Sequence, residues 1–223
     1  MVAEAIRAEV LEANLGLARH GLVKGTSGNA SGRDPASGLI IIKPSGVPYE
    51  RLEKADLVVV DLDGRVVSTS GMRPSTDTES HLRIYRGDER IGGVVHTHST
   101  YASVWAALGR DIPPIVTFIA DEFGGAVPCG NYRSIEGAAI GEEVLRVRGR
   151  SRAVLMKSHG VFCLGPNVPT ALRSAIAVEE AAKIAWLVEQ AGGADPLPPE
   201  EIERYFSYHE HGYGQPAREG SER

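Results

Sequence analysis

The sequence predicts a single α/β domain built around a mostly antiparallel sheet. Its 223 residues fit one large domain or two small ones, and 42% hydrophobic with 24% charged residues is typical of a globular protein. Helical and strand-like patterns alternate irregularly and include a hairpin, which favours antiparallel pairing. Neither Gly-x-Gly-x-x-Gly nor Gly-x-x-x-x-Gly-Lys-Ser/Thr follows a predicted strand, so a doubly wound nucleotide-binding fold fits less well.

Hydrophobic periodicity predicts the elements in order along the chain. Apolar residues at helical spacing indicate an amphipathic helix over residues 2–20, which Gly21 would end. The Gly- and Ser-rich segment 25–32 predicts a tight turn that enters a strand. Short β-branched runs predict further strands at 39–43, 57–61, 91–98 and 153–157, with a hairpin at 61–64. The other predicted helices are 75–85, 101–108 and 170–190, followed by a Gly/Pro-rich linker over 192–199.

The charge balance and the cysteine content exclude several classes of protein. Lys and Arg total 24 against 29 Asp and Glu, and the net charge of −5 argues against bulk attraction to nucleic acid or anionic lipid. No apolar run approaches the roughly 20 residues of a membrane span, and the first residues carry acids where a signal peptide is basic. Cys129 and Cys163 are too few for a disulfide framework. We therefore expect a cytoplasmic protein without nucleic-acid or membrane partners.

Three histidines form the strongest candidate for a metal site. His96 and His98 lie two residues apart on a predicted strand, so both imidazoles project from the same face. His159 follows the strand predicted at 153–157. Three neutral imidazoles with an open coordination position are typical of a catalytic zinc site, although other divalent metals fit the same donors. For the His-x-His pair alone, the alternative is two packed polar residues.

Asp77 precedes the strand that carries the histidines, at the end of Arg73-Pro-Ser-Thr-Asp77. One interpretation is an acid at a helix N-terminus, where the helix dipole favours negative charge. The other is a carboxylate beside the metal, acting as a fourth ligand or as a proton-transfer group. Glu79, two residues further on, is open to the same role.

Two turns rich in Gly and Ser suggest an anion-binding site. Backbone amides in such turns form concave nests that hold phosphate oxygens, and a helix start adds further donors. A lysine beside the second turn would supply positive charge, although each cluster alone is more often only a turn. The candidate residues are Gly28, Asn29, Lys43, Ser45, Gly46, Ser75 and Thr76.

Taken together, the motifs resemble the class II aldolase/adducin family over residues 5–190. In order, they are Ser27-Gly-Asn29, Ile42-Lys-Pro-Ser-Gly46, Arg73-Pro-Ser-Thr-Asp77, His96-Thr-His98 and Ser158-His-Gly160. The resemblance implies one zinc ion per subunit, bound by the three histidines, and a substrate phosphate held by the Asn, Ser-Gly and Ser-Thr segments. It also implies an α/β/α fold and a homotetramer of fourfold symmetry with active sites between neighbouring subunits. The catalytic domain would span 1–191, and 192–223 would form a linker and a tail that contributes to the active site.

Within the family, the sequence is most similar to the L-ribulose-5-phosphate 4-epimerase type. Asp77, Thr117 and the Tyr-Gly-Gln at 213–215 match the epimerase pattern, whereas the aldolase type has Glu and Tyr at the first two positions. The resemblance implies that Asp121 and Tyr213, supplied by the adjacent subunit, exchange protons on opposite faces of an aldehyde. His159, however, comes 61 residues after His98, which matches the compact L-fuculose-1-phosphate aldolase type.

We therefore expect a zinc-dependent enzyme that performs retro-aldol chemistry on a phosphorylated ketose through a metal-stabilised enediolate. Three alternatives stay open: a lyase that releases dihydroxyacetone phosphate and an aldehyde, a sugar-acid phosphate decarboxylase, and an adducin-like scaffold without activity. The complete set of three histidines and Asp77 weighs against the scaffold, which needs no metal. Near the C-terminus, His209 and His211 are interpreted as a surface pair rather than as ligands.

Overall fold

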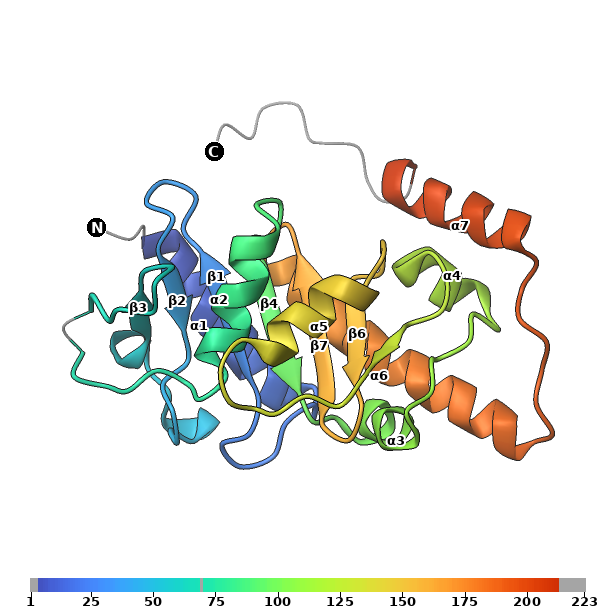
Figure 1. The fold of residues 1–223 in the computed structure, drawn as a ribbon, viewed down its shortest axis with the longest axis horizontal. Coiled ribbons are helices and arrows are strands. Elements are labelled where there is room, and N and C mark those ends of the chain that lie inside the picture. Colours follow the sequence, from blue (N-terminus) through green and yellow to red (C-terminus); the bar gives the residue numbers. More distant parts are fainter. Residues whose placement is uncertain (1–3, 69, 213–223) are drawn as a thin grey trace.

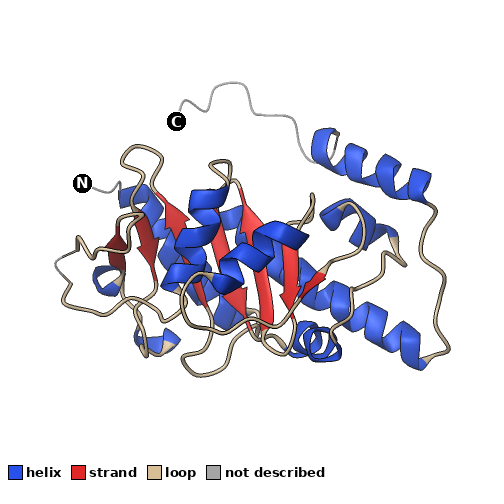
Figure 2. Cartoon of the chain, in the orientation of Figure 1, coloured by secondary structure: helices blue, strands red, loops and turns tan. Residues whose placement is uncertain are grey.

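One central sheet runs through the molecule, and helices cover both of its faces (Figures 1 and 2). The computed structural model describes residues 4–68 and 70–212. Within them, the strands are β1 (Asn29–Arg33), β2 (Ile40–Ile42), β3 (Val58–Val60), β4 (Gly93–Thr97), β5 (Cys129–Gly130), β6 (Ala153–Met156) and β7 (Gly160–Gly165). The helices are α1 (Glu4–Arg19), α2 (Thr78–Gly87), α3 (Thr100–Leu108), α4 (Thr117–Phe123), α5 (Ala139–Val147), α6 (Val168–Gln190) and α7 (Pro199–His211), with short 3-10 turns η1 (Tyr49–Arg51) and η2 (Lys54–Asp56).

The sheet is mostly antiparallel, as the sequence predicts. Its strand order is β3-β2-β1-β4-β7-β6-β5, and every neighbouring pair is antiparallel except β5 with β6. The register places Asn29 of β1 beside His96 of β4, and His96 beside Phe162 of β7. The sheet therefore fixes the relative position of motifs that are far apart in the sequence.

Successive strand residues pack into two separate cores, one on each face of the sheet. Ile41 and Val95 belong to the core that includes α1, α3 and α6. Their neighbours Ile42 and Val94 belong to the core that includes α2 and α5, which pack against each other in front of the sheet in Figure 1. The two cores confirm the α/β/α arrangement, and they explain why these strands are apolar throughout rather than alternating.

Helix α6 is the longest of the described helices and contacts both β4 and β7. Asn167 caps its first turn by accepting a hydrogen bond from the Thr170 amide at 2.9 Å. Ten of its residues are buried, most of them alanines, whereas the larger Leu187 is 52% exposed. No helix within the described ranges is long and apolar enough to cross a membrane.

Several elements of the structure were not indicated by the sequence, namely β5, β7, α4, α5 and α7. Strand β7 has the sequence Gly-Val-Phe-Cys-Leu-Gly and is buried throughout, so no alternation marks it as a strand. Helix α7 begins at Pro199, inside the segment interpreted as linker and tail. Proline is favoured at the first position of a helix because it has no amide hydrogen to satisfy there, so Pro199 starts α7 instead of breaking it.

Candidate metal centre and anion-binding cavity

The three candidate histidines come together at one end of the sheet. His96 and His98 project from the end of β4, and His159 lies in the turn between β6 and β7. One ligand atom from each residue fits within 4.8 Å of the others, and the Nε2 atoms of His96 and His98 are 3.0 Å apart. His96 is buried, His159 is partly buried and His98 is exposed. The cluster has the donors and the open side that a catalytic metal site requires.

A carbonyl group sets the tautomer of His96. Its Nδ1 lies 3.0 Å from the Val161 carbonyl oxygen, which can only accept, so Nδ1 carries the proton and Nε2 is left with a lone pair. The ring of Phe162 stacks on His96 at 4.3 Å between centroids. Burial lowers the pKa of all three histidines, which favours the neutral imidazoles that a metal needs.

The β6–β7 turn holds His159 in place through an unusual backbone conformation. Ser158 has a φ of 59°, in the left-handed region that residues with a Cβ seldom adopt. The His159 amide donates to the Met156 carbonyl at 2.9 Å. A Cβ on Gly160 would lie 2.4 Å from the Thr97 carbonyl oxygen, so only glycine lets the turn approach β4 this closely.

Asp77 directs its carboxylate toward Asn29 instead of capping α2. Asn29 Nδ2 donates to Asp77 Oδ2 at 2.7 Å and lies 2.9 Å from the Ser75 hydroxyl. Burial acts to raise the pKa of Asp77, but the nearby rings of His96 and His81 and the hydrogen bond from Asn29 bring it below its usual range. The carboxylate is therefore ionised beside the histidines.

Glu79 occupies a different environment from Asp77. Its carboxylate forms an ion pair with Arg86, which lies further along the same helix α2. It does not line the cavity that contains Asp77, His98 and His159. The geometry thus favours Asp77 over Glu79 as the carboxylate beside a metal.

All seven candidate phosphate-binding residues line one cavity of about 330 Å³. Asp77, His98 and His159 line the same cavity, together with Ile135 from the segment after β5. Residues from six separate parts of the chain line it, and several of these parts meet because β2, β1, β4 and β7 are neighbours in the sheet. The cavity therefore combines an anion-binding nest with the histidine cluster. Its residues from the candidate list are Gly28, Asn29, Lys43, Ser45, Gly46, Ser75 and Thr76.

Lys43 is buried on the wall of this cavity, with 1% of its surface exposed. Its ammonium lies 4.8 Å from the centre of the Tyr49 ring, a cation–π contact, and 3.5 Å from the Thr26 carbonyl oxygen. Burial lowers the pKa of Lys43. Because only weak, long contacts offset its charge within the described residues, Lys43 is a strong partner for an anion in the cavity.

Tyr49 was not identified from the sequence, where a single tyrosine in a polar turn carries no signal. Its hydroxyl lies 2.9 Å from the Ser27 carbonyl oxygen and 2.8 Å from that of Gly28. Gly28 itself has a φ of 74°, and a Cβ there would lie 2.8 Å from the His96 carbonyl oxygen. Tyr49 and Gly28 thus fix the first turn of the anion nest against β4.

A buried hydrogen-bonded group under α2 was also missed. The Ser31 hydroxyl lies 2.7 Å from His81 Nδ1 and 2.9 Å from the Tyr85 hydroxyl. Burial lowers the pKa of His81 to about 4, although the charge of Asp77 opposes this. Asp77, His81 and Tyr85 are spaced by four residues, so they share one helix face, and this spacing is the signal that could have found them.

Asp121 and Tyr213 do not join the histidine cavity within the described chain. Asp121 lies on α4 and lines a separate cavity of about 690 Å³ between α4, α6 and α7. Burial raises the pKa of Asp121, and the nearby His209 partly offsets this effect. Tyr213 lies outside the described residues. His209, interpreted as one of a surface pair, is half-buried on α7: 15% of its side chain is exposed and its Nε2 lies 3.5 Å from Glu122 Oε1, whereas His211 is exposed.

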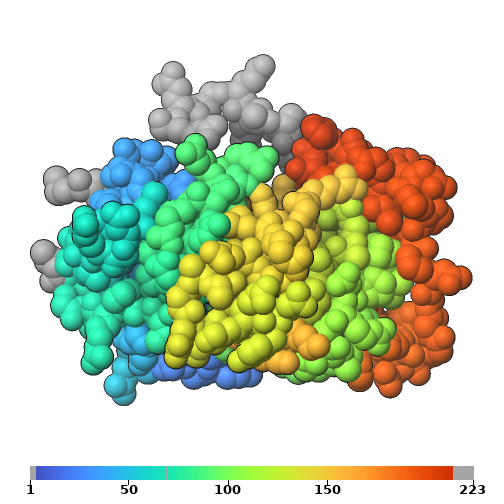
Figure 3. All heavy atoms as spheres, in the orientation of Figure 1, coloured from blue at the N-terminus to red at the C-terminus, as the bar shows by residue number. Residues whose placement is uncertain are grey.

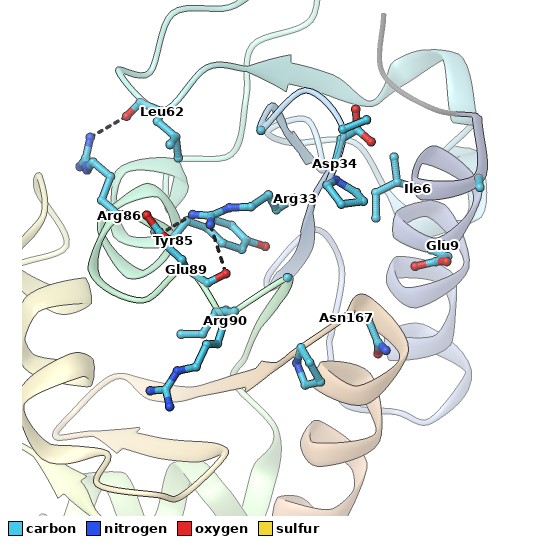
Figure 4. Close-up of a pocket in the computed structure, with 17 residues that line it drawn as sticks. Ile6, Glu9, Arg33, Asp34, Leu62, Tyr85, Arg86, Glu89, Arg90 and Asn167 are labelled. Carbon is cyan, nitrogen blue, oxygen red and sulfur yellow. Dashed lines mark hydrogen bonds between the residues drawn. The ribbon is translucent and has the colours of Figure 1, made fainter.

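A further cavity of about 850 Å³ lies at the opposite end of the sheet, near the start of β4 and the end of β7 (Figure 4). None of the described candidate residues lines it. The guanidinium of Arg33 projects into this region and donates to the carbonyl oxygens of Tyr85 and Glu89 (Figure 4). Backbone carbonyl oxygens therefore offset the charge of Arg33, whereas only weak, long contacts offset that of Lys43.

Comparison with known proteins identifies the class to which this fold and site belong. The family described as Class II Aldolase and Adducin N-terminal domain matches residues 8–186. The chain belongs to this family, and the prediction made from the five motifs is confirmed.

Among the relatives, two are named L-ribulose-5-phosphate 4-epimerase UlaF, from Salmonella paratyphi C (strain RKS4594) and Salmonella choleraesuis (strain SC-B67). Each is 39% identical over 226 residues, covering 94% of this chain and 98% of the relative. A solved structure named L-fuculose 1-phosphate aldolase has a TM-score of 0.89 and 30% identity, covering 94% of this chain and 98% of its own. The L-fuculose-1-phosphate aldolase from Thermus thermophilus has a TM-score of 0.70 and 25% identity, covering 88% and 100%. The relatives are named as epimerases and aldolases, which confirms the prediction of an enzyme of this family.

Proposed function

We propose that this protein is a metal-dependent L-ribulose-5-phosphate 4-epimerase. One observation carries the proposal: a single cavity combines convergent imidazoles, an ionised carboxylate beside them, and a nest of amides and hydroxyls around a buried lysine. The relatives that are 39% identical and bear this name support the choice of reaction. Such an enzyme inverts one hydroxyl-bearing carbon of a ketose phosphate by breaking and re-forming the adjacent carbon–carbon bond.

His96, His98 and His159 would hold the metal. The donor set fits a divalent cation, because two ring nitrogens face each other at 3.0 Å and the buried Nδ1 of His159 has no hydrogen-bond partner among the described residues. Three imidazoles with an open position favour zinc, one ion per subunit. When bound, the metal supplies Lewis-acid polarisation of the substrate carbonyl.

The anion nest would bind and orient the substrate through its phosphate. The amides around Gly28 and Gly46 and the hydroxyls of Ser45 and Ser75 are donors that line the cavity. Lys43 would add a charge whose effect is strong because it is buried in a low-dielectric wall. With the phosphate held, the reacting end of the sugar is kept close to Asp77, whose carboxylate would accept or position a hydroxyl proton of the substrate.

Asp121 and Tyr213 of a neighbouring subunit would transfer protons on the two faces of the aldehyde fragment. The separation of Asp121 from the histidine cavity of its own chain supports supply from another subunit. Burial raises the pKa of Asp121, which makes its carboxylate a better proton acceptor. This arrangement requires an oligomer with active sites between subunits, and we propose a homotetramer in a cytoplasmic protein.

An aldolase-type lyase is the second candidate. The structural likeness to L-fuculose 1-phosphate aldolase, with a TM-score of 0.89, favours it, as does the compact spacing between His98 and His159. The two reactions share the bond cleavage and differ in whether the aldehyde is retained. Decarboxylation of a sugar-acid phosphate would use the same binding groups but release carbon dioxide.

The test is turnover of the zinc-loaded protein with L-ribulose 5-phosphate, followed by NMR. We expect D-xylulose 5-phosphate to form without free aldehyde. Release of aldehyde as the main product would overturn the epimerase assignment in favour of the lyase. A matched sample of the Asp77→Asn variant should bind substrate but turn it over roughly 100-fold or more slowly, because only the proton-handling carboxylate is removed.

A further inference from the structure

Helix α7 is attached to the rest of the molecule by several polar contacts and by the ring of Phe206, which lies beside Gly124 and under the Arg150 guanidinium. None of its residues is buried, and it lies on the surface beside α4 (Figures 1 and 3). Arg152 contacts both carboxylate oxygens of Glu210 at 2.7 and 2.9 Å, and Arg150 contacts Glu203 at 2.7 Å. These two pairs join α7 to the segment that leads into β6. They hold the helix near the body of the protein, and Arg152 and Glu210 line the same cavity as Asp121.

A third contact differs from these two in its location. His209 Nε2 lies 3.5 Å from Glu122 Oε1, with 15% and 10% of the two side chains exposed. The side chains of the Arg152–Glu210 pair are 22% and 29% exposed, and those of the Arg150–Glu203 pair are 45% and 62% exposed. The His209–Glu122 contact is therefore the most enclosed of the three, in a place where water screens a polar interaction least.

This contact joins α7 to the part of α4 that carries a proposed proton-transfer group. Glu122 directly follows Asp121 on α4, and both line the cavity that α7 covers. His209 lies near the end of α7 and lines the same cavity. The position of α7 on α4 thus decides the environment of Asp121.

We propose that His209 is a positioning residue, which through Glu122 sets Asp121 in the arrangement needed for proton transfer. The inference rests on the proposed function, since Asp121 acts only if the chemistry is epimerisation. His209 touches neither the histidine cavity nor, on this proposal, the substrate. It acts on the rate of the proton-transfer steps and leaves the binding of metal and phosphate unchanged.

The variants His209→Gln and Glu122→Gln test this proposal, with His211→Gln as the matched control. His211 is on the same helix but exposed, and its Nδ1 lies 2.9 Å from the Ser207 carbonyl oxygen of α7 itself. We expect His209→Gln and Glu122→Gln each to lower kcat by about 10- to 100-fold, the effect of a small misplacement of reacting groups. KM, bound metal and thermal unfolding should stay as in the wild type, and His211→Gln should behave as the wild type.

A second measurement follows the helix directly. Hydrogen exchange of the α7 amides should be faster in both glutamine variants than in the control, and the double variant should be no slower in turnover than either single one, because both remove the same contact. The proposal would be overturned by a wild-type kcat in His209→Gln. It would also be overturned if the loss of kcat in the double variant equalled the product of the two single losses.

The Asp121→Asn variant separates this inference from the proposed function. If Asp121→Asn loses activity while His209→Gln keeps it, only the positioning role of His209 is wrong. If Asp121→Asn keeps full activity, the catalytic role given to Asp121 fails, and the positioning role that depends on it fails with it.

Discussion

The two ends of the proposed catalytic machinery are built in opposite ways. The histidine cavity is part of the sheet: Asn29 and Lys43 are each 1% exposed, and strand register fixes Asn29 beside His96. Helix α7 instead has no buried residue and is joined by ion pairs to the segment that leads into β6. The first region is preorganised by the same packing that stabilises the fold. The second is adjustable, so its disturbance should change catalysis more than stability.

The largest effect is expected at the metal cluster. The His96→Ala variant should lose bound metal and at least about 1000-fold in kcat, because Lewis-acid catalysis contributes several kcal/mol to lowering the barrier. Metal content per chain and turnover should be measured together, with the exposed His20→Ala as control. Full activity in a His96→Ala protein without metal would show that the cavity is not the metal site.

The next effect concerns the rigidity of the anion nest. Gly28→Ala should lower the free energy of unfolding by about 3 kcal/mol, because the residue would keep a left-handed φ and place its Cβ 2.8 Å from the His96 carbonyl oxygen. Gly46→Ala is the control: its φ is 71°, but a Cβ would meet no atom within 4 Å, so only about 1 kcal/mol is expected. Denaturant unfolding measures both, and equal losses would mean that the close approach is unimportant.

The carboxylates of two ion-paired glutamates, Glu143 and Glu203, differ in how far they are buried. Glu143, 1% exposed, contacts Arg133 at 2.8 Å and the Asn131 amide at 2.7 Å, whereas Glu203 on α7 is 62% exposed. Glu143→Gln should lower the free energy of unfolding at pH 7 by about 2 kcal/mol, since a buried neutral amide is a weaker acceptor for Arg133, Arg146 and the Asn131 amide than the carboxylate. Glu203→Gln should cost less than about 0.5 kcal/mol. Comparable losses would contradict the expectation that the exposed ion pairs of α7 contribute little to stability.

The pH dependence of the same variant has a definite sign. Hydrogen bonds from Arg146, the Asn131 amide and Arg133 lower the pKa of Glu143 from 4.5 to about 2, against the effect of burial. The ionised form therefore stabilises the fold fully above pH 4.5, and this contribution is lost as the pH falls toward 2. The stability difference between wild type and Glu143→Gln should shrink over that window in unfolding measurements. A difference that stays constant down to pH 2 would argue against this ion pair.

The smallest effect is expected from salt. Raising the salt concentration from about 0.05 to 0.5 M should speed hydrogen exchange in α7 by about two- to fivefold, because exposed ion pairs contribute only about 0.2–1 kcal/mol each and are screened. The amides of α6, whose Asn167 cap and buried face do not depend on such pairs, serve as the internal reference. Salt-independent exchange in α7 would mean that apolar contacts of Phe206 hold the helix instead.

The sequence was informative where chemistry and short-range geometry coincide. His96 and His98 share a strand face at a spacing of two, and a single strand prediction is enough to place them together. The helices 4–19 and 168–190 were expected within a few residues, because their buried faces repeat at helical period. Strand β7 was missed because burial on both sides removes any alternation.

By itself, then, the sequence determined the α/β class, the mostly antiparallel sheet, the family and the set of candidate residues, since these depend on local periodicity and on residue types within motifs. Only the tertiary structure decided which residues meet. Two contacts join segments that are far apart in the chain: the hydrogen bond from Asn29 to Asp77 and the contact of His209 with Glu122. Such contacts follow from strand register and helix packing, which depend on the burial of whole faces of the sheet and helices. No single stretch of sequence is therefore enough to predict them.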